Sequence, residues 1–127
     1  MNYGFGKKVE LSFDEAVLKV RTELSKEGFG VLTEIDVKAT LKKKLDVDYG
    51  EYIILGACNP PFAYEALKAE KEIGLFLPCN VIVYVDKGEI YVSAINPIEA
   101  MSIVENEKLE EVAKEVGEKL KRVIDLI

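Results

Sequence analysis

The chain of 127 residues contains no histidine, glutamine or tryptophan and only two cysteines, Cys58 and Cys79. Without histidine it lacks the side chain that most often serves as a general base near neutral pH and as a metal ligand. Two cysteines are too few for a disulfide framework, and a chain of this length can bury a core without one. These absences disfavour histidine-based catalysis, zinc sites built on histidine and disulfide scaffolds.

Positive charge is also scarce, since 17 lysines and arginines stand against 23 acidic residues and give a net charge of -6. Nucleic acids and anionic membranes attract clustered basic residues, so we expect neither as a partner. The one basic run, Lys42-Lys43-Lys44, fits the solvated face of a helix. No apolar stretch resembles a leader or approaches the length that crosses a bilayer, and we expect a cytoplasmic protein.

The residues that are present predict a single domain over residues 1–127. Hydrophobic residues make up 49% of the chain and charged residues 31%, a balance that offers enough apolar surface to offset the entropy of ordering. Most of the charged residues are Lys and Glu, a bias typical of thermophilic proteins.

Hydrophobic periodicity and capping residues predict alternating strands and helices. Ser12 and Glu15 form a capping box before a helix that stops at Gly28. A long last helix carries an apolar stripe from Leu109 to Ile127. The turn at residues 86–89 joins a hairpin. Strands are expected at residues 3–11, 30–36, 51–58, 81–86 and 90–95, and shorter helices at 37–45, 60–72 and 97–101. Antiparallel strands with helices on one face predict an α+β fold.

Each cysteine lies beside an asparagine and a proline, in Cys58-Asn59-Pro60 and in Pro78-Cys79-Asn80. Asn59 and Asn96 each precede a proline at a predicted helix start, where an N-cap asparagine accepts a backbone hydrogen bond. Asn80 has no such role, because it opens a strand in which asparagine is disfavoured. A polar contact or an exposed position is needed to explain it.

Three interpretations of the thiols remain open. They can be buried structural cysteines, or a redox pair in which one is the nucleophile, since Cys58 precedes a helix N-terminus that lowers a thiol pKa. They can also bind a soft metal such as Cu(I) together with Met101. Pro60 and Pro61 weaken the nucleophile interpretation, because neither offers an N–H to a thiolate. In regular strands Cys58 and Cys79 would point to opposite faces, unless the proline before Cys79 breaks the alternation.

Two further surfaces stand out in the predicted strands. Glu34 and Asp36 share one strand face and are candidates for acid–base chemistry, with a solvated face or a helix cap as the alternative. Another strand face is too apolar to be left open on a stable monomer and predicts a homodimer. This face carries Tyr52, Ile54, Ile82, Tyr84, Tyr91 and Ile95.

The stretches GFGVLTEIDVKATLKKKL, ILGACNPPFAYEAL, IGLFLPCNVIVY and INPIEAM together resemble the family known as domain of unknown function 302. The resemblance covers nearly the whole chain and implies an α+β fold similar in plan to TATA-binding protein, with strand, helix, four strands and helix. It also implies a tendency to form homodimers, and no established activity. The recurring positions of the family correspond to Glu34, Asp36, Lys38, Cys58, Asn59, Pro60, Pro78, Cys79, Asn80, Pro97 and Met101.

We therefore favour a noncatalytic or weakly catalytic homodimeric module that binds a small molecule or a soft metal near the two Cys-Asn turns. The alternatives are a thiol-dependent redox or sulfur-handling enzyme with Cys58 or Cys79 as nucleophile, and a pure protein-interaction module. The candidate metal ligands are Cys58, Cys79 and Met101. The candidate ligand-binding residues are Glu34, Asp36, Lys38, Cys58, Asn59, Cys79 and Asn80.

Overall fold

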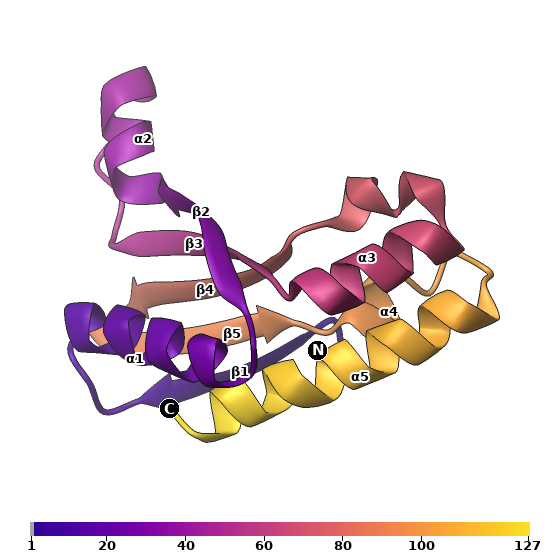
Figure 1. Ribbon diagram of the computed structural model, residues 1–127. Coiled ribbons are helices and arrows are strands. Elements are labelled where there is room, and N and C mark those ends of the chain that lie inside the picture. The colour runs from indigo at the N-terminus through magenta and orange to yellow at the C-terminus, as the bar shows by residue number, and fades with distance from the viewer. Residues whose placement is uncertain (1) are drawn as a thin grey trace.

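The computed structural model describes residues 2–127 and contains one five-stranded sheet (Figure 1). The strand order is β1-β5-β4-β3-β2, and each neighbouring pair is antiparallel. The predicted α+β fold, in which short helices are added to a strand, helix, four-strand, helix plan, is confirmed. The elements are β1 (Gly4–Val9), α1 (Phe13–Lys26), β2 (Gly30–Asp36), α2 (Val37–Leu45), β3 (Tyr52–Cys58), α3 (Pro60–Ala69), η1 (Lys71–Phe76), β4 (Cys79–Asp86), β5 (Glu89–Ile95), α4 (Pro97–Ala100) and α5 (Glu107–Asp125).

Local sequence explains several of these boundaries. The Ser12 hydroxyl accepts a hydrogen bond from the Glu15 N–H at 3.1 Å, and the Glu15 carboxylate accepts one from the Ser12 N–H at 3.0 Å. This is the predicted capping box. The predicted hairpin turn also forms, and Lys87 and Gly88 both have positive φ angles, of 51° and 80°. Two positive φ angles are what a type I′ turn requires.

The short helices differ from the prediction. Helix α3 ends at Ala69, and the following residues form the 3₁₀ turn η1, so Gly74 does not end α3. Helix α2 forms where it was predicted, but none of its residues is buried. Leu45, which was expected to face inward, is 66% exposed. The physical reason is that α2 stands away from the rest of the molecule, beyond the ends of β2 and β3 (Figure 1).

The main core lies between the sheet and the helices that cover one of its faces. Helices α1 and α5 lie along this face, and α3 lies beside α5 (Figure 1). No helix within residues 2–127 combines the length and the apolar character that a membrane span needs. Fully buried side chains of this core come from α1, α5 and the central strands, and include Val20, Leu24, Leu55, Val81, Val83, Val92, Leu120 and Val123.

A second, smaller cluster fills the space between α3, η1, α4 and α5. Its buried members are Ala66, Ile73, Met101, Leu109 and Ala113. Met101 was predicted to lie inside the short helix, and it is found directly after it, at the C-cap of α4. The two clusters meet at Val112, which packs against both of them.

The other face of the sheet carries a row of tyrosines. The register pairs Tyr52 with Tyr84 and Tyr84 with Tyr91. In both pairs the rings stack with their centroids 5.3 Å apart. Ile54 and Ile82 are paired two residues further along the same strands, so they share the tyrosine side of the sheet.

Gly56 is the position in β3 where a side chain does not fit. A Cβ atom there would overlap the Thr33 hydroxyl and lie 2.8 Å from Pro78 Cγ. We expect Gly56→Ala to lower the free energy of unfolding by about 1–3 kcal/mol, because both neighbours must move. Gly30→Ala is a matched control in the adjacent strand, since its Cβ would meet nothing within 4 Å. Urea denaturation measures both variants, and equal stabilities would contradict this account.

Candidate functional site

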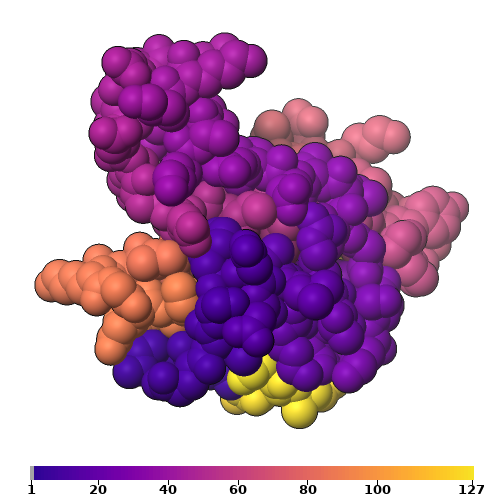
Figure 2. Space-filling view, turned by 90° about the vertical axis from the view of Figure 1, so that its left-hand side faces the viewer, coloured from indigo at the N-terminus to yellow at the C-terminus, as the bar shows by residue number. Residues whose placement is uncertain are grey.

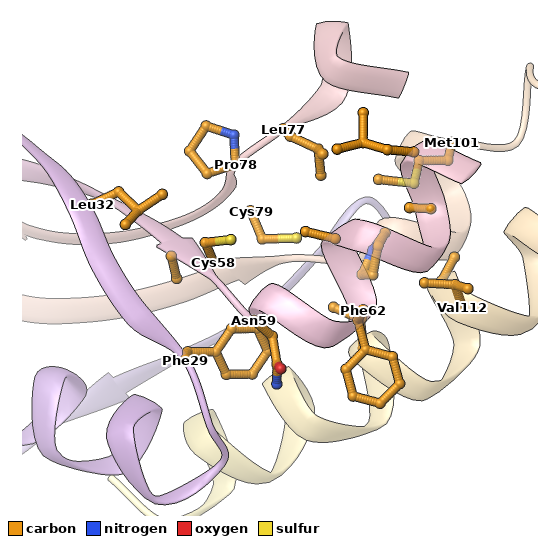
Figure 3. A pocket seen from close by; sticks show the side chains of 17 residues that line it. Phe29, Leu32, Cys58, Asn59, Phe62, Leu77, Pro78, Cys79, Met101 and Val112 are labelled. Carbon is orange, nitrogen blue, oxygen red and sulfur yellow. The ribbon is translucent and has the colours of Figure 1, made fainter. Parts of the chain in front are cut away.

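A pocket of about 320 Å³ opens where α3, α4 and α5 meet the ends of the central strands (Figure 3). This volume lies at the lower end of the range usual for small-molecule sites. None of the lining residues in the described part of the chain carries a charge. The lining residues are Phe29, Leu32, Ala57, Cys58, Asn59, Phe62, Ala63, Ala66, Leu67, Leu77, Pro78, Cys79, Pro97, Met101, Val112, Ala113 and Val116.

Both cysteines line this pocket, and Figure 3 shows them among its lining side chains. Cys79 opens β4 and is paired with Ala57, which faces the core. Cys58 is the last residue of β3, where the chain turns through Asn59 into α3. Strict alternation would direct the two thiols to opposite faces. It does not hold here because Cys58 lies at the strand end, where the pleat gives way to the turn.

The two thiols differ in their surroundings. Cys79 is 7% exposed, and burial raises the pKa of its thiol to about 11, with a smaller contribution from the neighbouring Cys58. The Cys79 thiol is therefore protonated near neutral pH, and a protonated thiol is a poor nucleophile. Cys58 is only half-buried, so it is the better placed of the two for reaction with a molecule in solution.

Met101 brings a third sulfur-containing side chain to the same cavity. It is buried at the end of α4 and lines the pocket together with both cysteines (Figure 3). Within residues 2–127, no group of three or more His, Cys, Asp or Glu side chains could hold a metal ion. A metal in this pocket would therefore depend on two thiolates and one thioether, a donor set that suits a soft ion.

Asn59 occupies the predicted N-cap position of α3, but its side chain does not cap the helix. Its amide Nδ2 instead donates a hydrogen bond to the Glu27 carbonyl oxygen at 3.0 Å. The first two helical residues, Pro60 and Pro61, have no N–H to donate to a capping oxygen. The side chain consequently ties the turn between β3 and α3 to the end of α1, a role that the capping prediction missed.

Glu27 connects this turn to the last helix as well. Arg122 donates hydrogen bonds to both carboxylate oxygens of Glu27, at 3.0 and 3.3 Å, and the Lys119 ammonium lies 3.6 Å away. The hydrogen bonds from Arg122 hold the pKa of Glu27 below its usual value. Because the folded-state pKa is lowered, this stabilisation is present above the unfolded-state pKa and is lost as the pH falls.

Asparagine amides also hold the other two helix starts near the pocket. The predicted cap at Asn96 is confirmed, since its Oδ1 accepts from the Ile98 N–H at 3.2 Å. Asn106 caps α5 through the Leu109 N–H at 3.1 Å and donates to the Ala69 carbonyl oxygen at 2.7 Å. The sequence interpretation missed Asn106, although an asparagine just before an apolar helical stripe is a recognisable signal.

Four of the predicted ligand-binding residues do not line the pocket. Glu34 pairs with Arg21, and Lys38 is exposed on α2. Asp36 caps α2 by accepting from the Ala39 N–H at 2.9 Å, which is the alternative that the sequence left open. Asn80 is exposed and lies opposite Gly56, on the tyrosine side of the sheet. Its exposed position explains how a strand accommodates this asparagine.

The apolar wall of the pocket was not predicted from the sequence. Phe29 comes from the connection between α1 and β2 and Phe62 from α3, and Leu32 of β2 is 68% exposed. An apolar residue in a strand or helix is normally read as core, so no local signal distinguishes a pocket wall. The lining residues described by the structure include no carboxylate and no imidazole. Cys58 is the more accessible of the two candidate nucleophiles.

The fold and the pocket together define a small α+β protein. Helices cover one face of its sheet, and an apolar pocket that contains two thiols lies at the end of the strands. The chain belongs to the family described as domain of unknown function DUF302, which matches residues 5–127. It is also similar to the crystal structure of an uncharacterized conserved protein DUF302 from Bacillus stearothermophilus. The TM-score is 0.92 and the identity 27%, over 98% of each chain. No curated protein matches the chain.

We expect iodoacetamide to modify Cys58 well before Cys79. With a pKa of about 11, about one Cys79 thiol in ten thousand is ionised near neutral pH, and this fraction rises about tenfold per pH unit. Mass spectrometry of digested protein across a pH series measures both sites, with the single variants Cys58→Ser and Cys79→Ser as controls. Equally rapid modification of both thiols near neutral pH would contradict the burial argument.

Proposed function

We propose that the protein binds a small apolar molecule in the pocket beside Cys58 and Cys79. The observation that supports this most directly is the lining, which combines aliphatic and aromatic carbon with two thiols, one thioether and one amide. A charged ligand would lose its hydration there without gaining an opposite charge, which is costly. An uncharged ligand would gain by leaving water, in proportion to its apolar area.

The rim of the pocket supports an entry route for such a ligand. Leu32 from β2 is 68% exposed and Leu67 from α3 is 40% exposed. Both line the pocket, and neither is part of the two buried clusters. An apolar molecule would cover these leucines as it enters, so that surface now in contact with water becomes part of the binding site.

The uncharged dye N-phenyl-1-naphthylamine provides a test, because its fluorescence rises on transfer from water to an apolar site. We expect saturable binding to the wild type. Ala63→Phe should weaken it at least about tenfold, a loss of about 1.4 kcal/mol, because the added ring occupies the pocket that Ala63 lines. Glu65→Phe is the control on the same helix, since Glu65 is exposed and lies outside the pocket lining.

Equal dye binding by both variants would show that the dye binds elsewhere and would contradict the proposal. Circular dichroism establishes that both variants remain folded, so that a loss of binding is not confused with unfolding. A competing apolar compound should displace the dye from the wild type with a single midpoint.

A soft metal ion such as Cu(I) is a second candidate ligand, favoured by the presence of Cys58, Cys79 and Met101 in one pocket. Anaerobic titration of the reduced protein should give binding that is lost in both Cys58→Ser and Cys79→Ser. Met101→Leu should weaken binding less, because a thioether carries no charge. Equal Cu(I) binding by the wild type and both serine variants would exclude this site.

We also propose that the protein is a homodimer that buries the tyrosine side of the sheet. This face carries three stacked tyrosines and is not covered by α1, α3 or α5 (Figure 1). An extended apolar face on a soluble protein usually marks an interface. A second copy of the chain is the partner that is always available to it.

A further inference from the structure

We propose that α2 and the loop after it dock on the tyrosine side of the sheet in a second copy of the chain, and that the second copy does the same in return. Residues 37–49 are called the arm here. The tyrosine face consists of Tyr52, Ile54, Ile82, Tyr84 and Tyr91. Ile95 was predicted to belong to this face, but it packs against the main core instead. This inference rests on the proposed homodimer and specifies which surfaces meet in it.

The arm carries apolar side chains that its own chain leaves largely exposed. None of the residues of α2 is buried, and the apolar side chains of the arm remain in contact with water, with exposures of 66% for Leu45, 45% for Val47 and 49% for Tyr49. A helix of nine residues gains little stability by itself, and helices in proteins are stabilised mainly by packing of an apolar face. The arm therefore needs a surface on which to pack.

The position of the arm places it beside the tyrosine face but not upon it. The ring of Tyr49, at the end of the arm, lies 6.4 Å from the ring of Tyr52, the first tyrosine of the row. From there α2 leads away from its own sheet (Figure 1), and Figure 2 shows it standing clear of the rest of the molecule. Because the arm starts at the margin of its own tyrosine face, it is well placed to reach the tyrosine face of a second copy that packs against the first.

The charges of the arm and of the tyrosine face are also complementary. Lys38, Lys43 and Lys44 belong to α2, and none of them forms an ion pair within residues 2–127. Asp86 lies two residues beyond Tyr84, so alternation puts its carboxylate on the tyrosine side of the sheet. Glu89, two residues before Tyr91, lies on the same side but already forms an ion pair with Lys8 at 3.3 Å. Asp86 forms no ion pair within residues 2–127, so the lysines of an arm would offer this carboxylate an opposite charge.

The arm and the face also complement each other in apolar character. The arm offers aliphatic side chains and one tyrosine, and the face offers stacked aromatic rings flanked by isoleucines. Aromatic and aliphatic anchors surrounded by charge are the usual composition of a stable protein interface. Two reciprocal contacts of this kind obey the twofold symmetry that is commonest in homodimers.

Sedimentation equilibrium across a dilution series first measures the mass of the wild type, which we expect to be that of a dimer. Leu45→Glu should raise the dissociation constant at least about tenfold, since it puts a charge into the apolar surface of the arm. Leu18→Glu is the matched control, because Leu18 is equally exposed at 66% but lies on α1, on the other side of the sheet. It should leave the dimer unchanged.

A mixing experiment identifies which surfaces touch. Tyr84→Lys should disrupt the face as Leu45→Glu disrupts the arm, and each variant alone should be largely monomeric. In an equimolar mixture, the intact arm of the Tyr84→Lys chain can still dock on the intact face of the Leu45→Glu chain. The mixture should therefore recover dimer. Tyr91→Lys serves as a second face variant if circular dichroism shows that Tyr84→Lys is unfolded.

The outcomes separate the two proposals. A monomeric wild type would overturn both the dimer and the arm contact. A dimeric wild type that is unaffected by Leu45→Glu would overturn the arm contact and leave the dimer standing. Dimers that are lost in both variants but not recovered on mixing would favour direct packing of the two faces and would also overturn the arm contact.

Discussion

The rest of the structure depends on one constraint, which is that helices cover only one face of the five-stranded sheet. Side chains alternate along a strand, so each strand serves two faces. In β3 and β4 one set, including Leu55 and Val83, is buried beneath the helices. The other set, including Tyr52 and Tyr84, lies on the face that those helices do not cover. The same strands thus form a core on one face and an uncovered row of tyrosines on the other.

The pocket follows from how the helices meet the end of this sheet. Helices α3, α4 and α5 each begin at an asparagine, and the amides of Asn59 and Asn106 bind backbone carbonyl oxygens of distant segments. These bonds fix the turns around the cavity, and the apolar side chains between them leave it about 320 Å³ of space. Burial in such surroundings keeps the Cys79 thiol protonated, which suits a binding site better than a nucleophilic one.

The residues that the resemblance to the DUF302 family singled out separate into two regions. Cys58, Asn59, Cys79 and Met101 gather at the pocket. Glu34, Asp36 and Lys38 instead lie at the junction of β2 and α2, where Asp36 starts the helix that projects from the molecule. Asn80 lies apart from both regions, on the tyrosine side of the sheet. The family positions therefore need not belong to a single site.

The amino-acid sequence by itself determined the element types, the capping box at Ser12 and the hairpin turn at Lys87 and Gly88, because these depend on periodicity and on contacts a few residues apart. Only the tertiary structure decided that Cys58 and Cys79 share a pocket, since this depends on where β3 ends against β4. It likewise decided that the Asn59 side chain donates a hydrogen bond to the Glu27 carbonyl oxygen at the end of α1, and that α2 has no buried residue. These outcomes rest on contacts between residues far apart in the chain, which local patterns do not encode.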